Sequence, residues 1–246
     1  MPGMNPIAHI HTDLPQKFGI PRNGSLAPHL RGEIRFEPEF ASAAAVAGLD
    51  EFSHLWLLWQ FENGLAGGTA ADIATDAASA PAGVANRNWR PTVRPPRLGG
   101  AERVGVFATR SPFRPNPIGL TCVRLDHIEL AEDGPVVHVL GADLRDGTPI
   151  YDIKPYIPFA DCHPEATGGW IEHSPWHELE VDVAPELRDR VPASKLDGLL
   201  EVLRQDPRRA GSKHEPERVY HLAYAGLDVA FTVDGDVLHV AGVSEP

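Results

Sequence analysis

The residues best suited to chemistry in this chain are arginines set among prolines. The segments WRPTVRPPRLGG (89–100) and FATRSPFRPNPIGL (107–120) repeat this pattern. Because proline fixes its own φ angle and restricts the residue before it, the neighbouring guanidinium groups are held near defined positions. Arginine makes planar, bidentate contacts with phosphate or carboxylate, so the pattern predicts a site for an anionic ligand. A stiff corner that closes a barrel would use the same residues, and spacing alone does not separate the two interpretations.

The distribution of charge favours the ligand interpretation. The net charge of the chain is −12, which by itself argues against a nucleic-acid partner because phosphate contacts are made by Lys and Arg. Between Arg87 and Arg124, however, eight arginines stand against the single acid Glu102, which gives +7 there and −19 in the rest of the chain. This segregation indicates a local face for an anionic ligand on an acidic protein, with a solvated charged surface as the alternative.

The bulk properties set limits on location and cofactors. With 246 residues and 42% hydrophobic content, the chain can bury one substantial core, or one core and a small appendage. Apolar runs are too short to span a bilayer, and the N-terminal MPGMNPIAHIHTDL lacks a signal-peptide pattern, so we expect a cytoplasmic protein without a membrane partner. The two cysteines, Cys122 and Cys162, have neither disulfide-framework nor zinc-site spacing, and we expect no metal.

Short strands are expected to position the arginine segments. The apolar pattern predicts strands at Pro6–Ile10, Gly32–Phe36, Phe52–Phe61, Arg103–Thr109, Gly119–Ile128 and Val136–Gly141. Consecutive strands without long intervening helices predict a mainly β fold, a β-barrel, because a doubly wound parallel sheet needs crossover helices. A GxGxxG motif is also missing, so the fold is not Rossmann-like. Residues 64–88, rich in alanine and glycine, predict a mobile insertion that is either a lid or a linker.

The pattern changes after Trp170. Four leucines between residues 196 and 203 lie on one face of a helix that should stop at Asp206, and strands are expected at 219–233, with a break at Gly226, and at 237–243. We therefore expect a β-barrel domain over residues 4–171 and a small α+β C-terminal domain over residues 184–246. The second domain is too short for a large core, so it should pack on the first domain or on a partner subunit.

Five segments together are similar to the TsaA-like, or TrmO, family. They are GIPRN (19–23), EFSHLWLLWQF (51–61), WRPTVRPPRLGG (89–100), VGVFATRSPFRPNPIGL (104–120) and ADLRDGTPIYDIKPYIPFAD (142–161). The resemblance covers roughly residues 4–170, and LRQDPRRA (203–210) with residues 220–233 more weakly resembles the C-terminal domain of bacterial members. The family's proteins are β-barrel methyltransferases, usually dimeric. The resemblance implies a homodimer that transfers a methyl group from S-adenosylmethionine to N6 of threonylcarbamoyladenosine, beside the anticodon (position 37) of tRNA.

The resemblance also implies a cofactor pocket assembled from several short segments. Its residues are Pro21, Arg22, Asn23, Glu62, Asn63, Arg110, Leu120, Asp143, Leu144, Arg145 and Asp146. S-adenosylmethionine carries a sulfonium, an ammonium and a carboxylate, so Arg22 or Arg110 would pair with its carboxylate and Asp143 or Asp146 with its cationic part. Turn formation is the alternative for both aspartates. The family usually has His where this chain has Glu62, which changes the local charge.

The acceptor nitrogen is a weak nucleophile, because its lone pair is delocalised into a carbonyl and the purine. Asp152, Lys154 and Tyr156 are the candidate catalytic residues that would orient or deprotonate it, although methyl transfer can also proceed through proximity and alignment. Two further functions remain open from the sequence. One is a non-catalytic barrel that binds RNA or nucleotides, and the other is a methyltransferase of the same fold that acts on a different small nucleophile.

Overall fold

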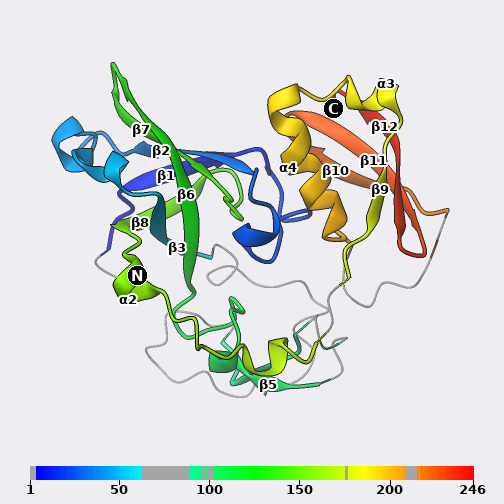
Figure 1. Ribbon diagram of the computed structural model, residues 1–246, viewed down its shortest axis with the longest axis horizontal. Coiled ribbons are helices and arrows are strands. Elements are labelled where there is room, and N and C mark those ends of the chain that lie inside the picture. Colours follow the sequence, from blue (N-terminus) through cyan, green and yellow to red (C-terminus); the bar gives the residue numbers. More distant parts are fainter. Residues whose placement is uncertain are drawn as a thin grey trace.

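The structure is a computed structural model that describes residues 4–61, 89–95, 98, 102–174, 177–208, 215 and 217–246. The expected insertion at 64–88 and the predicted pocket residues Glu62 and Asn63 lie outside this part of the chain. Figure 1 shows the described chain in three parts: a barrel on the left, a second sheet with helices on the right, and a small segment around β5 below them.

Six antiparallel strands form a closed barrel in the order β1-β2-β7-β6-β3-β8. Their bounds are β1 Ala8–Thr12, β2 Arg31–Phe36, β3 His54–Gln60, β6 Ile118–Ala131, β7 Gly134–Leu140 and β8 Thr148–Pro155. Alternate side chains fill the interior: Leu55 and Leu57 of β3 are fully buried, as are Ile10 of β1 and Ile34 of β2. The mainly β fold and the barrel predicted from the sequence are therefore confirmed.

The pairing of β1 with β8 closes the ring. It consists of three residue pairs, Ala8–Ile150, His9–Pro149 and Ile10–Thr148. Because the pairing is antiparallel, the end of β1 lies beside the start of β8, and the connections 13–30 and 141–147 leave the barrel at the same end. Strand β6 extends past the end of β7, since Leu140 lies opposite Arg124, and its first residues form a wall of that same end together with β3.

A second sheet has the strand order β10-β11-β12-β9. It comprises β9 Glu180–Asp182, β10 Tyr220–Tyr224, β11 Leu227–Asp234 and β12 Val237–Ser244, with helices α3 Pro185–Arg188 and α4 Ala193–Arg204. The helix predicted from the leucine spacing is confirmed as α4, which buries Leu199 and Leu203. The predicted break at Gly226 is confirmed by a turn in which Ala225 and Gly226 have positive φ angles.

The first domain contributes to the core of the C-terminal domain. Leu14, Ala27 and Leu30, all in the β1–β2 connection, are at most 1% exposed and belong to the same apolar cluster as Phe231. Of the two arrangements expected from its small size, the C-terminal domain therefore shows packing on the first domain.

The remaining elements are short. They are β4 Thr92–Val93, β5 Val104–Gly105 and α2 Pro158–Asp161, together with the 3-10 helices η1 Gly24–Leu26, η2 Ala43–Val46, η3 Leu49–Glu51, η6 Val106–Ala108 and η7 Gly169–Ile171. Strand β5 pairs with β4 in a separate two-stranded sheet.

The strand expected over Arg103–Thr109 is wrong. Strand β5 covers two of these residues, and the chain then turns into η6. Side chains there do not alternate as in a strand, because Phe107 and Ala108 are both exposed, and the Thr109 N–H donates back to the Val106 carbonyl at 3.1 Å. The guanidinium of Arg114 donates to the carbonyl oxygens of Val106 and Thr109, which stabilises the turn. The apolar composition of the segment predicted burial but not this local hydrogen bonding.

We predict that Leu14→Ala destabilises the protein as strongly as a substitution inside the C-terminal domain would. Leu14 is fully buried in that domain's core, so its truncation should lower the free energy of unfolding by about 3 kcal/mol. Chemical denaturation followed by circular dichroism measures the effect. Leu130→Ala is the control, because Leu130 is 69% exposed and should change stability by less than about 0.5 kcal/mol. Equal effects of the two substitutions would contradict the shared core.

Candidate functional site

Two of the predicted pocket segments lie against each other at one end of the barrel. The backbone of Gly24, directly after Pro21–Asn23, approaches Gly141 so closely that a Cβ on Gly24 would lie 2.0 Å from the Gly141 carbonyl oxygen. Gly141 has a φ of +78°, a conformation that glycine adopts readily. The Asn23 side chain accepts a hydrogen bond from the Ser25 backbone N–H at 3.1 Å, which starts η1. These contacts fix the distance between the Pro21–Asn23 segment and residues 143–146.

Asp143 carries the strongest signal for a ligand. Its Oδ1 atom is buried and has no hydrogen-bond partner among the residues that the structure describes. An unpaired buried carboxylate oxygen costs free energy, so such a group calls for an explanation. Thr121 is beside it, on the part of β6 that extends past β7, and the Thr121 hydroxyl accepts a hydrogen bond from the Trp59 indole at 3.1 Å. A polar group therefore faces the interior end of an otherwise apolar barrel.

The electrostatics of Asp143 oppose its ionisation. Burial raises the pKa of its carboxyl above the usual value, while the neighbouring Thr121 hydroxyl, backbone N–H groups and the positive charge of Arg110 act in the opposite direction. Because desolvation is the largest of these effects, the groups beside Asp143 in the described part of the chain do not offset the cost of burying its charge. A bound cation would favour the ionised carboxylate, and a bound N–H group would pair with its free oxygen. The orphaned oxygen thus fits the ammonium, sulfonium or amine groups of a cofactor such as the one expected from the sequence.

The other residues of the 143–146 segment have structural partners. The Leu144 side chain is 1% exposed and packs in the barrel core, and its carbonyl accepts a hydrogen bond from the Thr12 hydroxyl. The Arg145 carbonyl accepts from the Thr148 hydroxyl at 2.7 Å. Asp146 accepts a hydrogen bond from the Thr12 N–H at 3.1 Å and lies 3.2 Å from the His11 ring. These contacts support the turn interpretation for Asp146, whereas Asp143 remains available to a ligand.

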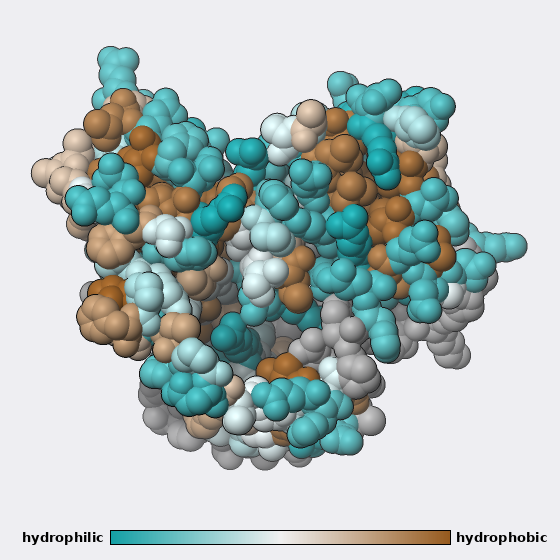
Figure 2. Space-filling view, in the orientation of Figure 1, coloured by the Kyte–Doolittle hydropathy of each residue, from teal (hydrophilic) through white to brown (hydrophobic). Residues whose placement is uncertain are grey.

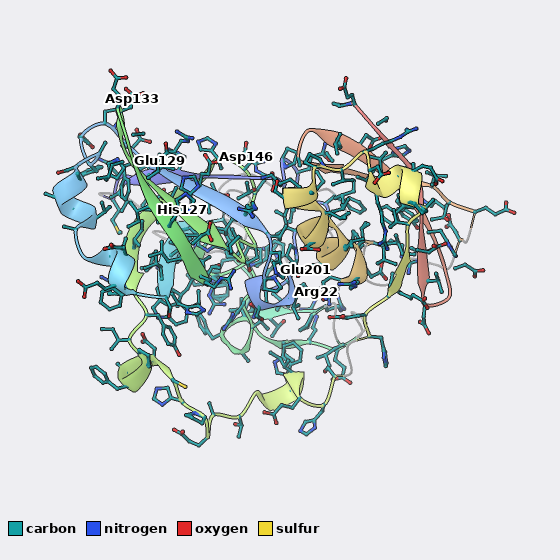
Figure 3. The ribbon with its side chains drawn as sticks, turned by 45° about the horizontal axis from the view of Figure 1, so that its top comes forward. Arg22, His127, Glu129, Asp133, Asp146 and Glu201 are labelled. Carbon is teal, nitrogen blue, oxygen red and sulfur yellow. The ribbon has the colours of Figure 1, made fainter. Side chains whose placement is uncertain are left out.

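Arginines border the same end of the barrel. Arg110 is exposed, follows η6, and is close enough for its charge to act on Asp143. Arg22 is also exposed, and Figure 3 places it centrally, where the barrel meets the C-terminal domain, with Asp146 at the barrel rim. Leu120 is 52% exposed on β6, directly before Thr121. Figure 2 shows a hollow in the surface between the barrel, the C-terminal domain and the segment around β5.

Two of the candidate catalytic residues, Asp152 and Lys154, lie on β8, and Tyr156 directly follows its last residue. The Lys154 ammonium lies 2.8 Å from Asp152 Oδ2, and the Ile153 N–H donates to Asp152 Oδ1 at 3.0 Å, so both carboxylate oxygens have partners. Tyr156 packs against the ring of Trp56, with centroids 5.8 Å apart. Desolvation and the nearby Cys162 raise the pKa of Tyr156, so its phenol stays protonated at neutral pH. Tyr156 is therefore suited to orient a substrate rather than to deprotonate it.

The structure adds two residues that the sequence did not single out. Thr121 lies next to Asp143, and Trp59 donates a hydrogen bond to the Thr121 hydroxyl, so the two residues contribute to the polarity and shape of this end. A Cβ on Gly119 would lie 2.1 Å from the Trp59 ring, so the indole covers this glycine. The alternation along β6 could have indicated Thr121, because it is a polar residue in the inward-facing series with Gly119 and Val123. Nothing in the sequence joins Trp59 to residue 143.

The described residues show neither a metal site nor a membrane-spanning helix. They contain no group of three or more His, Cys, Asp or Glu side chains that could hold a metal ion. None of the helices in the same part of the chain is long and apolar enough to cross a membrane.

Comparison with known proteins gives consistent relatives along the whole chain. Family models described as the tRNA-methyltransferase O N-terminal domain and the TrmO C-terminal domain match residues 9–162 and 177–246. An Escherichia coli K12 protein named tRNA (adenine(37)-N6)-methyltransferase is 40% identical over 216 residues, which cover 85% of this chain and 83% of that protein. A Pseudomonas aeruginosa protein named putative S-adenosylmethionine-dependent methyltransferase RcsF is 37% identical over 232 residues, covering 92% and 90% of the two chains.

The same relationship holds for the three-dimensional structure. A crystal structure of TrmO from P. aeruginosa matches with a TM-score of 0.72 at 32% sequence identity, over 99% of this chain and 97% of that one. The match extends through both the barrel and the C-terminal sheet.

We predict that Asp143→Asn does not destabilise the protein at pH 7. The substitution removes a buried charge at nearly constant volume, so the free energy of unfolding should stay equal or rise by about 1 kcal/mol. The pKa of Asp143 is raised in the folded state, so the penalty in the wild type exists above that raised pKa and disappears as the pH falls toward the ordinary value of 3.8. Urea denaturation between pH 7 and pH 4 should therefore show the wild type gaining stability relative to the variant. A constant difference over this range would contradict the assignment.

Proposed function

Because this chain belongs to the TrmO family of tRNA methyltransferases, we propose that it transfers a methyl group from S-adenosylmethionine to N6 of the adenine at position 37 of tRNA. We further propose that the acceptor base carries the threonylcarbamoyl group, as the family resemblance implies. The observation that supports the proposal most directly is the buried Oδ1 atom of Asp143, which has no hydrogen-bond partner among the described residues and lies in the segment that follows the close approach of Gly141 to Gly24.

The residues of this chain have distinct parts in the proposed reaction. S-adenosylmethionine, when bound, supplies an electrophilic methyl group on a sulfonium cation. Asp143 offers a carboxyl group in surroundings of low dielectric, where a bound cation would favour its ionised form and would be attracted more strongly than in water. We assign Arg110 and Arg22 to the cofactor carboxylate. Glycines 24 and 141 let the two segments approach closely enough to form one cradle.

The acceptor nitrogen has to be aligned, and it has to lose a proton during transfer. Asp152 is the carboxylate of the three candidates, and Lys154 already holds one of its oxygens, so any proton acceptance by Asp152 competes with that ion pair. Tyr156 is protonated and is suited to hydrogen bonding. We therefore assign β8 mainly a role in orientation, and we attribute most of the rate enhancement to proximity and alignment rather than to a strong general base.

The tRNA partner fits the charge distribution. The arginine-rich stretch between residues 87 and 124 carries +7 on a chain of net charge −12, so phosphate contacts are concentrated beside the pocket. From the family resemblance we also infer a homodimer and a cytoplasmic location. The exposed side chains of Phe107 and Phe159, at 73% and 92%, offer apolar surface that a second subunit could cover.

The direct test is methyl transfer in vitro. We expect incorporation of label from S-adenosylmethionine into tRNA that bears threonylcarbamoyladenosine at position 37, and none into the same tRNA without that modification. Mass spectrometry of the digested nucleosides identifies the product. A barrel that only binds RNA would bind the tRNA without transferring label. A methyltransferase for a small neutral nucleophile would lack the steep loss of substrate affinity with rising salt that phosphate contacts cause.

We predict that Arg110→Ala weakens cofactor binding more than Arg94→Ala does. The charge of Arg110 reaches Asp143, so its guanidinium lies beside the proposed pocket. Removing its contact with the cofactor carboxylate should lower the affinity for S-adenosylmethionine by about 2 kcal/mol, the range of a hydrogen bond to a charged group. Arg94, which is exposed beside β4, should change this affinity by less than about 0.5 kcal/mol. Titration calorimetry measures both. Equal losses would mean that the arginines do not divide between the cofactor and the tRNA in this way.

A further inference from the structure

The β1–β2 connection, which carries Pro21–Asn23, is held at both ends by α4 of the C-terminal domain. At the first end, the Lys195 ammonium donates to both carboxylate oxygens of Asp13 at 2.8 Å, and the Asp13 carbonyl accepts from the Ala225 N–H at 2.8 Å. The side chains of Asp13 and Lys195 are 11% and 28% exposed, so the pair is largely shielded from solvent. A shielded, bidentate pair of this kind is more strongly coupled than an ion pair on the surface.

The second end is held by Glu201, one of the residues that Figure 3 labels near Arg22. One oxygen of Glu201 accepts the His29 backbone N–H at 2.9 Å, and the other lies 2.5 Å from His29 Nδ1. The neighbouring Arg31 side chain donates to the carbonyl of Ser194 at 3.1 Å. The anchors at Asp13 and His29 thus lie eight residues before Pro21 and six residues after Asn23.

Between the two anchors the connection packs on the second sheet. Phe18 stacks on Phe231 with ring centroids 6.4 Å apart. Gly19 has a φ of +94°, and a Cβ there would lie 2.3 Å from the Leu222 side chain. The connection therefore follows the surface of the C-terminal domain up to Ile20, which also packs against that core, and Pro21 comes next.

Helix α4 itself is adapted to this contact. Gly198 lies in its middle, where glycine costs roughly 1 kcal/mol relative to alanine. A Cβ at this position would lie 2.7 Å from the Tyr224 hydroxyl and 3.3 Å from the His29 carbonyl oxygen. The Tyr224 hydroxyl in turn donates to the Lys195 carbonyl at 3.0 Å. Because Gly198 has no side chain, the part of α4 between Lys195 and Glu201 can approach the β1–β2 connection at His29.

Polar contacts and apolar packing both hold the first anchor, because Asp13 pairs with Lys195 and the next residue, Leu14, is buried in the C-terminal core. A cavity of about 400 Å³ lies beside it, lined among others by Asp13, Lys195, Pro192 and Asp146. Asp146 belongs to the 143–146 pocket segment, so the cavity lies between this segment and the first anchor. The ion pair of Asp13 with Lys195 acts here together with the Ala225 hydrogen bond and the buried side chain of Leu14.

The charge of the C-terminal domain does not suit phosphate binding. Residues 177–246 contain 14 acidic and eight basic side chains, a net charge of −6. A domain of this sign repels a polyanion over the range of a Debye length. The contacts of this domain with the β1–β2 connection favour a role in holding the candidate pocket over a role in binding phosphates.

We propose that the C-terminal domain holds the cofactor-binding segment Pro21–Asn23 in its binding conformation, with Lys195 and Glu201 as the positioning residues. This inference rests on the proposed function, because it takes Pro21–Asn23 as part of an S-adenosylmethionine pocket. If loosening the anchor leaves the segment in place in a tenth of the molecules, the apparent Kd for the cofactor rises about tenfold, because affinity scales with the competent fraction.

Titration calorimetry with S-adenosylmethionine on the full-length chain tests the proposal. Lys195→Met should raise the Kd about tenfold, and Lys195→Arg should restore it to within about threefold of the wild type. Arg208→Met is the matched control, since it removes a partly buried cation that pairs with Asp206 at 2.7 Å inside the C-terminal domain. It should leave the Kd unchanged. In turnover, Lys195→Met should raise KM for the cofactor and leave kcat at saturation within about twofold, because the substitution changes the conformation of Pro21–Asn23 only before the cofactor binds.

Each alternative outcome has a separate meaning. A wild-type protein that does not bind S-adenosylmethionine would overturn the proposed function. A wild type that binds, with Lys195→Met and Arg208→Met indistinguishable from it, would overturn the positioning role alone. Should Lys195→Met fail to fold, Glu201→Gln replaces it with the same expected direction. Hydrogen exchange of the folded variant should quicken in residues 13–30 and stay unchanged in β3; unchanged exchange in 13–30 would also overturn the role.

Discussion

Closure of the barrel is the constraint on which the candidate site depends. Three residue pairs between β1 and β8 complete the ring, and they bring the connections that follow β1 and precede β8 to one end. Strands β1 and β8 are far apart in sequence, so their pairing must overcome the loop-closure entropy of most of the first domain. Closure brings Asp146 to the Thr12 N–H, while the adjoining pairing of β2 with β7, in which Arg31 lies opposite Leu140, brings Gly24 to Gly141 at the same end.

The buried carboxyl of Asp143 costs the fold stability, and under the proposed function this cost is offset when a cationic ligand binds. A closed barrel of this size fills its interior with side chains, and here an apolar interior ends in an acidic group with one unsatisfied oxygen. Such a group persists because the surrounding strands are stable enough to hold it. Electrostatic preorganisation of this kind requires no rearrangement when a cation arrives, which is how a rigid site gains affinity.

The sequence predicted the architecture better than the details of the site. Alternating and continuous apolar runs located β3, β6, β7 and α4, because burial on one face leaves a periodic pattern. Strand β8 was missed, since Pro149 and Pro155 interrupt its pattern and a bulge opposite Leu58 and Trp59 breaks the alternation. The neighbour of Asp143 could not be inferred, because Thr121 reaches it through the pairing of β6 with β7, whose register the sequence does not reveal. The strand prediction over Arg103–Thr109 was wrong because local hydrogen bonds from Arg114 stabilise a turn there.

The β1–β2 connection belongs to the barrel by chain order and to the C-terminal domain by packing, since Leu14, Ala27 and Leu30 lie in the second core. The boundary between the two domains along the sequence therefore differs from the boundary between their two apolar cores. Recombination between relatives at the boundary between the two matched family regions, residues 9–162 and 177–246, would separate residues 13–30 from the core in which they pack. A functional chimera has to inherit this connection together with the C-terminal domain, so the two segments form one unit of exchange although more than 140 residues separate them.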